Sequence, residues 1–225
     1  MKGILIAIEG IDGSGKGTQA NLLFQKLQEK SIPAKLYSFP GYEKTFFGEE
    51  IGAFLRGEFG TLEQVHPKLA SILFAGDRFE QKNEIEEDLK EGVVVICDRY
   101  VDSNIAHQCA KRPAEERQGF AKWLETLEYS VFSAAKPDIT FFLDVPLDIS
   151  KELVLKKGKR SYTDTKEDIH ESSYEYLDKV YETYMELWLE RQWVKIRCTD
   201  EDGIKGINEI GEDLSKHVLN RLGMA

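Results

Sequence analysis

The sequence lacks the marks of a secreted, membrane-spanning or disulfide-rich protein. Its three cysteines, Cys97, Cys109 and Cys198, lie far apart and show none of the spacings of a metal or redox site. We expect free, mostly buried thiols. No apolar run approaches the roughly 20 residues that span a bilayer. The opening apolar stretch is short and leads straight into a loop, which is atypical of a signal peptide. We therefore expect a cytoplasmic protein with no membrane contact.

The chain also lacks a surplus of positive charge. Its 30 Lys and Arg residues stand against 40 Asp and Glu residues, which gives a net charge of -10. This balance argues against a nucleic-acid partner, because phosphate backbones are bound by clustered Lys and Arg. An acidic protein that binds anionic substrates must gather its cations locally. The position of each basic group is therefore informative.

Length and composition are those of one soluble globular domain. The chain is 41% hydrophobic and 31% charged, a combination that neither disordered nor membrane chains show. Its 225 residues suffice for one well-buried core and require no second one. We expect a single domain over residues 1–225.

Strand-like and helix-like segments alternate along the sequence. Apolar runs that predict buried strands occupy residues 4–8, 34–39, 93–97, 139–145 and 193–197. Helical patterns lie between them, at residues 16–29, 67–91, 103–110, 114–133, 167–189 and 203–222. This alternation predicts an α/β fold, with a doubly wound, five-stranded parallel sheet flanked by helices. Ligands of such sheets bind beyond the carboxyl ends of the strands.

A glycine-rich loop directly follows the first predicted strand and fits the pattern GxxxxGK. Backbone N–H groups of such a loop turn inward around a phosphate, the helix start adds positive potential, and Lys16 can bridge the β- and γ-phosphates of ATP. The alternative is a glycine turn that only caps a helix. The candidate ATP-binding residues are Gly10, Asp12, Gly13, Ser14, Gly15, Lys16, Gly17 and Thr18. The hydroxyl that usually follows the lysine and reaches Mg²⁺ is displaced here to Thr18.

An Asp-Arg pair follows the buried strand at residues 93–97. Asp98 and Arg99 are expected at the carboxyl end of a parallel strand, facing the glycine loop. The carboxylate can hold Mg²⁺ or orient an attacking phosphate, and the guanidinium can clamp an acceptor phosphate through two parallel hydrogen bonds. The alternative is a surface ion pair of little energetic value.

Two predicted helices each present chemistry-bearing side chains on one face. Phe74 and Arg78 are four residues apart, and Asn104, His107 and Gln108 stand at i, i+3 and i+4. An aromatic ring beside a planar donor fork suits a pyrimidine base. From the residues alone, core packing of Phe74 and solvation of Arg78 remain the alternative.

These motifs together resemble thymidylate kinases. The pattern DRYxxSNxAxQ follows a buried strand, GxDGxGK lies upstream, and Phe39-Pro40 follows the second strand, so that the likeness extends over nearly the whole chain. The GKGTQ string is also similar to the loop of adenylate kinases. The resemblance implies a P-loop nucleoside monophosphate kinase that transfers the γ-phosphate of ATP to dTMP with Mg²⁺, and commonly a homodimer.

The resemblance also implies roles for individual residues. Phe74 stacks on the base, Arg78 donates to its O4, and Asn104 bonds the base. The other implied substrate-binding residues are Asp12, which accepts from the acceptor 3′-hydroxyl, and Phe39, Pro40, Arg99, Ser103, His107 and Gln108. His107 stands where a Tyr or Phe commonly excludes ribose. The arginine that commonly follows Phe-Pro is absent, and Lys44 is its nearest substitute.

A basic segment, residues 156–166, is the least patterned part of the chain and is expected to form a short lid. Its cations would arrive as the site closes and water leaves. Because position 13 is glycine, the chain resembles kinases whose catalytic cation lies in the lid. We assign that role to Arg160 first and Lys159 second. A merely solvated basic face is the alternative.

Other functions remain open at this point. A kinase for another nucleoside monophosphate, such as dUMP, shares the loop but does not predict a base pocket with Phe74, Arg78 and Asn104. A non-catalytic P-loop module would bind nucleotide without transfer, and intact Lys16 and Asp98 argue against it. A structural protein whose acidic surface binds other proteins would show no thermal shift with nucleotide.

Overall fold

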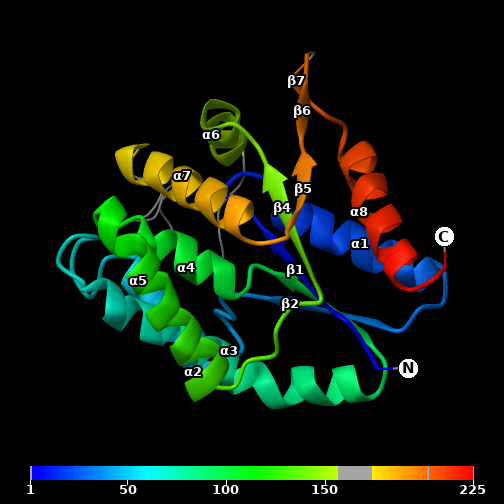
Figure 1. Cartoon of the computed structure of the whole chain (residues 1–225), viewed down its shortest axis with the longest axis horizontal. Coiled ribbons are helices and arrows are strands. Elements are labelled where there is room, and N and C mark those ends of the chain that lie inside the picture. Colours follow the sequence, from blue (N-terminus) through cyan, green and yellow to red (C-terminus); the bar gives the residue numbers. More distant parts are fainter. Residues whose placement is uncertain (1, 157–173, 202, 225) are drawn as a thin grey trace.

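Five parallel strands form the central sheet of the molecule (Figure 1). The computed structural model describes residues 2–156, 174–201 and 203–224. The sheet has the order β2-β3-β1-β4-β5. Its strands are β1 (Leu5–Glu9), β2 (Ala34–Ser38), β3 (Val94–Asp98), β4 (Ile139–Asp144) and β5 (Val194–Arg197). All five predicted strands are confirmed, with boundaries that differ by at most one residue.

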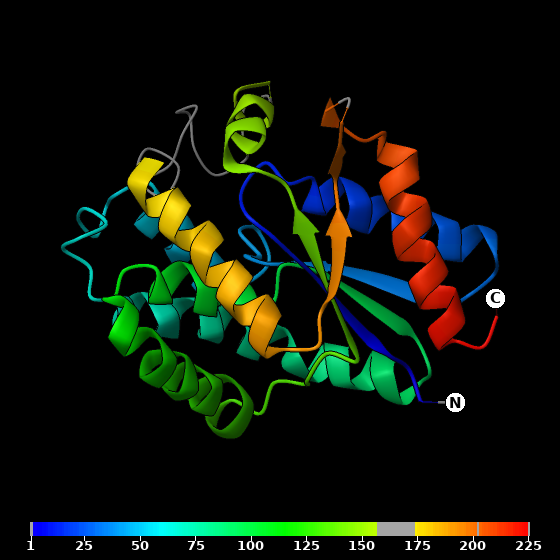
Figure 2. The ribbon, with the colours of Figure 1, turned by 45° about the horizontal axis from the view of Figure 1, so that its top comes forward.

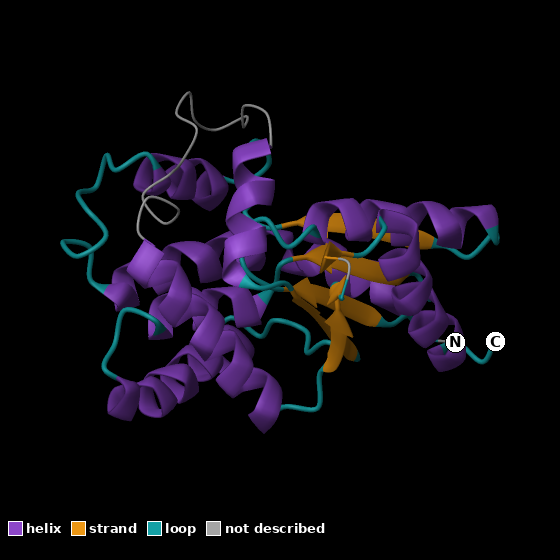
Figure 3. Cartoon of the chain, turned by 90° about the horizontal axis from the view of Figure 1, so that it is seen from above, coloured by secondary structure: helices purple, strands orange, loops and turns teal. Residues whose placement is uncertain are grey.

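Helices cover both faces of the sheet (Figure 3). α1 (Lys16–Glu29) and α8 (Ile207–Arg221) pack on one face, where they contact Ile6 and Ile8 of β1. The other face, with Leu5 and Ala7, is covered by four helices. These are α3 (Pro67–Lys90), α4 (Val101–Cys109), α5 (Ala114–Glu125) and α7 (Tyr174–Glu190). Alternate residues of one strand thus enter two cores, as the uninterrupted apolar run predicts.

Two predicted helices differ from the structure by more than two residues at one end, whereas the helix expected at 103–110 is α4, two residues longer at its start and one shorter at its end. The helix expected at 114–133 is wrong as one element, because α5 ends at Glu125 and a π-helix, Thr126–Val131, follows. This wide turn contains the fully buried Glu128, whose carboxylate is held by Arg78. The helix expected at 203–222 starts only at Ile207, because β7 (Gly203–Ile204) pairs with β6 (Thr199–Asp200) in a small antiparallel ribbon.

Two helices were not predicted. α2 (Phe46–Leu55) begins at Thr45, whose hydroxyl accepts a hydrogen bond from the Gly48 backbone N–H at 2.8 Å. α6 (Leu147–Lys156) follows β4 and lies over the glycine loop. Of the helix expected at 167–189, residues 167–173 lie outside the described part of the chain.

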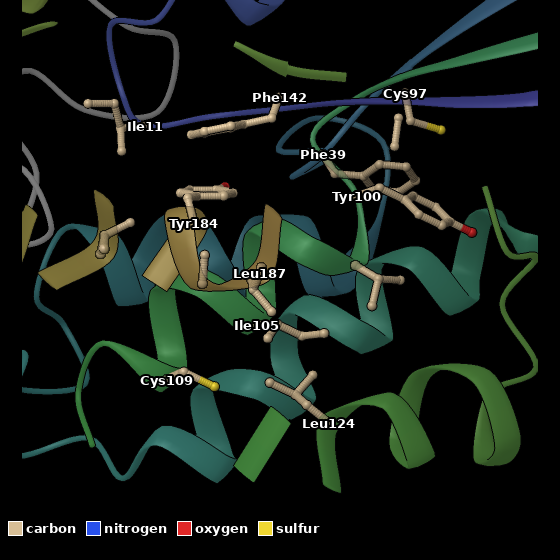
Figure 4. Close-up of a cluster of buried hydrophobic side chains, with 14 of the residues drawn as sticks. Ile11, Phe39, Cys97, Tyr100, Ile105, Cys109, Leu124, Phe142, Tyr184 and Leu187 are labelled. Atoms are coloured by element: carbon tan, nitrogen blue, oxygen red, sulfur yellow. The ribbon is translucent and has the colours of Figure 1, made fainter. Parts of the chain in front are cut away.

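Aromatic packing ties α7 and the segment after β2 to the sheet (Figure 4). The Tyr184 ring of α7 stacks on Phe142 of β4, with centroids 5.6 Å apart. Phe39, after β2, contacts the Tyr100 ring at 5.9 Å. The three cysteines are buried and free, as expected. Within the described ranges, no helix combines the length and apolarity needed to cross a bilayer.

Candidate active site

The glycine loop between β1 and α1 makes a tight turn that depends on its glycines. Gly10, Gly13 and Gly15 have φ angles of 148°, 80° and 86°, a region that side chains disfavour. A Cβ at Gly13 would lie 2.3 Å from the Ser150 carbonyl oxygen of α6. The Ser150 hydroxyl donates to the carbonyl of Asp12. The loop therefore packs closely against α6, which restricts the residue types that fit at position 13.

Lys16 lies over this loop and is buried. Its Nζ donates to the Ile11 carbonyl at 2.7 Å and to the Ser14 hydroxyl at 3.4 Å. Burial, together with the charge of Arg99, lowers the pKa of Lys16 to about 7, against the opposing effect of Asp12 and Asp98. A polyanion in the loop would favour the charged ammonium, because it supplies the counter-charge that burial removes.

The end of β3 meets the glycine loop. The register pairs Ile8 of β1 with Asp98 of β3, so the two strands end side by side. A Cβ at Gly17 would lie 2.9 Å from Asp98 Oδ2. A larger residue at position 17 would therefore displace this carboxylate, which gives a physical reason for glycine where a hydroxyl residue is usual.

Arg99 bridges the two segments. Its Nη2 forms an ion pair with Asp12 Oδ1 in the loop. The backbone of Arg99 has φ 65°, and its N–H donates to the Ile8 carbonyl at 3.0 Å. Burial alone lowers the pKa of Arg99, but Asp12 and further anions raise it overall, so the guanidinium stays charged. The structure thus brings together the loop and the Asp-Arg pair.

A buried carboxylate that was missed from the sequence, Glu9, anchors this junction. Glu9 is fully buried and accepts from Tyr100 N at 2.9 Å, from the Ser103 hydroxyl and from the Tyr184 hydroxyl at 3.3 Å. The Ser103 hydroxyl also lies 3.4 Å from Arg99 Nη1. Burial raises the pKa of Glu9, while these donors oppose the shift. The sequence signal that could have identified Glu9 is its position as a charged residue at the end of an apolar strand.

On the helical side, Arg78 is buried against a partner that was also missed from the sequence. Its Nε donates to Glu128 Oε2 at 2.9 Å, and its Nη2 pairs with Glu128 Oε1. Asn104 Nδ2 donates to the same Oε1 at 3.0 Å and to the Ser71 carbonyl at 3.1 Å. Arg78 and Asn104, from α3 and α4, are thus joined by one carboxylate. No sequence pattern marks Glu128 as a buried residue, because the spacing of its segment predicts an ordinary α-helix with charged residues on its exposed face.

Aromatic residues surround this cluster. Phe74 packs edge-on against Phe54 of α2, with centroids 6.3 Å apart, and remains partly exposed. The Arg78 guanidinium lies 5.9 Å from the Phe39 ring. The segment after Pro40 is held by Asp77, whose Oδ2 accepts from Gly41 N at 3.0 Å. Lys44 is exposed in that segment.

The remaining residues of α4 leave hydrogen-bonding capacity unused. Both amide atoms of the fully buried Gln108, and Oδ1 of Asn104, have no hydrogen-bond partner among the described residues. His107 Nδ1 lies 3.0 Å from the Tyr176 hydroxyl. Burial lowers the pKa of His107 to about 3, so its ring is neutral at pH 7. Buried polar atoms are normally satisfied, so these amides have hydrogen-bonding capacity for a polar ligand or an ordered water.

The donor set fits Mg²⁺ that arrives with a nucleotide. No group of three or more His, Cys, Asp or Glu residues within the described part of the chain is arranged to hold a metal by itself. Mg²⁺ is usually held by one or two carboxylates together with substrate phosphates and water. Asp98 beside the loop supplies one such carboxylate, and Thr18 is exposed in the first turn of α1. Lys159 and Arg160 lie outside the described residues.

Comparison with known proteins agrees with this geometry. The thymidylate kinase family model matches residues 8–206. A thymidylate kinase of Plasmodium falciparum is 31% identical over 96% of this chain and 90% of its own length. A probable thymidylate kinase of Archaeoglobus fulgidus is 32% identical over 98% of this chain and 97% of its own. The solved thymidylate kinase of Candida albicans superposes with a TM-score of 0.75 at 25% identity, over 100% of this chain and 94% of that one.

Proposed function

We infer the activity and the residue roles from one premise that the comparisons establish: this chain belongs to the thymidylate kinase family. We propose that it transfers the γ-phosphate of ATP to dTMP, giving dTDP and ADP. The observation that carries this proposal is the junction of the glycine loop with Asp98 and Arg99, where two phosphate groups can meet.

On the donor side, the ATP phosphates occupy the loop from Gly10 to Thr18, and Lys16 neutralises the β- and γ-phosphates. Asp98, with Thr18 as a second candidate, would hold Mg²⁺, which would supply further positive charge to the transferring group. Arg160 and Lys159 are the proposed lid cations. Phosphoryl transfer needs no protein nucleophile, so positioning and electrostatics are the contribution of the chain.

On the acceptor side, Arg99 exchanges its contact with Asp12 for the dTMP phosphate, and Asp12 then accepts from the sugar 3′-hydroxyl. Glu9 and Ser103 keep the Arg99 side chain directed at the junction. The exchange keeps an anion against the Arg99 guanidinium, so its charge stays compensated in this mostly buried position.

The base of dTMP occupies the cluster of Phe74, Arg78 and Asn104. Phe74 stacks on the ring, and Glu128 holds two nitrogens of Arg78 so that the third faces the base O4. Oδ1 of Asn104 and the amide of Gln108, which lack partners among the described residues, bond the base edge or the sugar. His107 fills the place beside the sugar as a neutral ring, and Phe39 and Pro40 border the pocket.

A substrate panel tests the proposal. Single nucleoside monophosphates are mixed with ATP and Mg²⁺, and ADP release is followed. dTMP should exceed dUMP, CMP and AMP in kcat/KM by more than about tenfold, or roughly 1.4 kcal/mol. Preference for another monophosphate would overturn the acceptor assignment. Nucleotide binding without ADP release would favour a non-catalytic module.

We further propose a homodimer of single domains, each with its lid at about 156–166, in the cytoplasm, where free cysteines stay reduced. Leu69, Ile72 and Phe79 of α3 leave apolar side chains exposed, with Phe79 52% exposed. A second copy of the chain would cover them. Light scattering after size exclusion should give twice the chain mass, and Phe79→Glu should give the monomer mass. A wild-type monomer would contradict the dimer.

A further inference from the structure

A cavity lies at the far end of α4 from the phosphate junction. Its volume is about 760 Å³. It lies between the segment that precedes α3, the turn after α4 and the first described turn of α7. These segments lie at the left of the molecule in Figure 2. None of its lining residues belongs to the proposed active site. Tyr176 separates the two, since its hydroxyl bonds His107 and its side chain lines the cavity.

The lining of this cavity contains more basic than acidic residues. Lys111, Arg112, Arg117 and Lys179 line it, against the acidic residues Glu63 and Glu175. The whole chain, in contrast, has a net charge of -10. A local excess of cations in an acidic protein concentrates anions, because fields in a concave surface are focused.

Three of these cations already have carboxylate partners. Arg112 pairs with Glu116 and Lys179 with Glu175 at 2.7 Å, and Arg117 contacts both Glu186 at 3.0 Å and Glu182 at 3.8 Å. They form a rim whose three positive charges face four carboxylates. The Arg112 and Lys179 side chains are 33% and 45% exposed, so their pairs are weak and exchange partners at little cost.

Lys111 differs from the rim. Its Nζ is buried and has no hydrogen-bond partner among the described residues. The Phe54 and Tyr176 rings lie 5.2 Å and 5.8 Å from this nitrogen. Burial lowers the pKa of Lys111 to about 7, and Glu63 only opposes the shift. The two rings attract the ammonium only weakly, and a buried amine without a hydrogen-bond acceptor is costly, so an anion in the cavity would lower that cost.

Two helix N-termini add to the positive potential. α3 begins at Pro67 and α5 at Ala114, and both residues line the cavity. The first turn of α3 contains no acidic residue, whereas that of α5 contains Glu115 and Glu116, so the positive end of α3 is the less compensated of the two. The α3 N-terminus and Lys111 therefore favour the same kind of ligand.

We propose that this cavity is a second anion-binding site, outside the active site, for a phosphate-bearing ligand that contacts Lys111. Lysine suits a phosphate as a compact point charge, and the arginine forks of the rim can reach its outer oxygens. The volume exceeds the needs of one phosphate and falls within the range of small-molecule sites. The phosphates belong either to a free inorganic anion or to the chain of a nucleotide.

Calorimetry tests the proposal on the full chain. The active site is first filled with a bisubstrate analogue that joins adenosine and thymidine through phosphates. Pyrophosphate is then titrated at low ionic strength, where screening is weak. We expect one site with a Kd below about 1 mM, and a loss of at least about tenfold in Lys111→Met. No binding to the wild type, or equal binding to Lys111→Met, would overturn the proposal. If the analogue fails to bind, the kinase assignment is contradicted, and the pyrophosphate titration of wild type against Lys111→Met still tests the cavity.

Matched variants separate binding from folding. Lys111→Arg should keep the site, and Lys90→Met, an exposed lysine at the other end of α3, should bind like wild type. If Lys111→Met does not fold, Arg112→Met and Lys179→Met at the rim should each weaken pyrophosphate binding by about threefold. Unchanged pyrophosphate affinity in both rim variants would refute the site.

A comparison of UTP with pyrophosphate identifies the source of the phosphates. Tighter binding of UTP would show that the ligand is a nucleotide, and equal binding of the two would show that it is a free anion.

Discussion

The phosphate junction and the base pocket are built in different ways. At the junction, the functional groups follow the carboxyl ends of β1 and β3, and sheet register brings them together: Ile8 pairs with Asp98. In the base pocket, the groups come from the faces of α3 and α4, and side-chain hydrogen bonds to Glu128 hold them. Backbone pairing thus fixes one half of the site, and a buried carboxylate fixes the other.

This difference predicts how each half responds to mutation. A side chain removed from the junction leaves the sheet intact, so activity should fall while the fold stays. A partner removed from the base pocket leaves a buried charge uncompensated, so stability should fall together with acceptor binding.

Lys16→Met should give the largest loss of activity with the smallest loss of stability. We expect kcat to fall by at least about 10³-fold, because the cation over the transferring phosphate is removed. The melting temperature should hold or rise, since burial lowers the pKa of Lys16 to about 7 and so disfavours its charge. Steady-state kinetics and thermal unfolding measure the two effects. Lys30→Met, an exposed lysine just after the same helix, is the control. Retained turnover would remove the loop from the mechanism.

Glu128→Gln should give a large loss of stability together with weaker binding of dTMP. It leaves Arg78 buried without its counter-charge, so the free energy of unfolding should fall by about 3 kcal/mol, and the KM for dTMP should rise more than the KM for ATP. Denaturant unfolding measures the free energy of unfolding, and steady-state kinetics with each substrate varied in turn measures the two KM values. The matched control is Glu125→Gln, whose carboxylate is partly exposed and pairs with Arg191 at the surface. An equal loss of stability in the two variants would contradict the claim that Glu128 compensates the buried charge of Arg78.

Phe74→Ala probes the base pocket without touching a charge. Loss of stacking should raise the KM for dTMP by about tenfold or more and leave the KM for ATP within about twofold. Phe59→Ala, at another partly exposed phenylalanine, should change neither. If dTMP and ATP suffer equally, Phe74 is a packing residue and the stacking role is lost.

His107 should make the base pocket sensitive to acid. Its folded pKa of about 3 lies below its ordinary value of 6.5, so the unfolded chain binds more protons between these values and stability falls as pH falls through this window. Between pH 7 and 5 this costs about 2 kcal/mol. In His107→Asn, the difference in unfolding free energy between these two pH values should shrink by that amount. His217→Asn, at an exposed histidine, is the matched control, and no change in His107→Asn would refute a buried neutral ring.

The same contrast explains which parts of the molecule could be predicted from the sequence. Strand order and the glycine loop follow from local pattern, since buried parallel strands are continuous apolar runs and a phosphate loop needs glycines at fixed spacing. The contribution of Glu9 could not be read from a pattern, because its donors Tyr100, Ser103 and Tyr184 come from distant parts of the chain.

Glu128 was hidden for a different reason. The π-helix that contains it shares the apolar spacing of the helix before it, so the two were read as one element. Its ion pair with Arg78 spans 50 residues of sequence, and no local rule connects them. Side-chain networks across elements are the part of a site that sequence periodicity does not encode.

The most direct test of the account is a crystal structure with the adenosine-thymidine bisubstrate analogue bound. The phosphate chain should run from the loop around Lys16 to the Arg99 guanidinium, with Arg99 moved from Asp12 onto a phosphate and the thymine between Phe74 and Asn104. A complex in which the analogue binds elsewhere, or in which Arg99 stays on Asp12 without touching phosphate, would contradict the claim that two nucleotides meet at this junction.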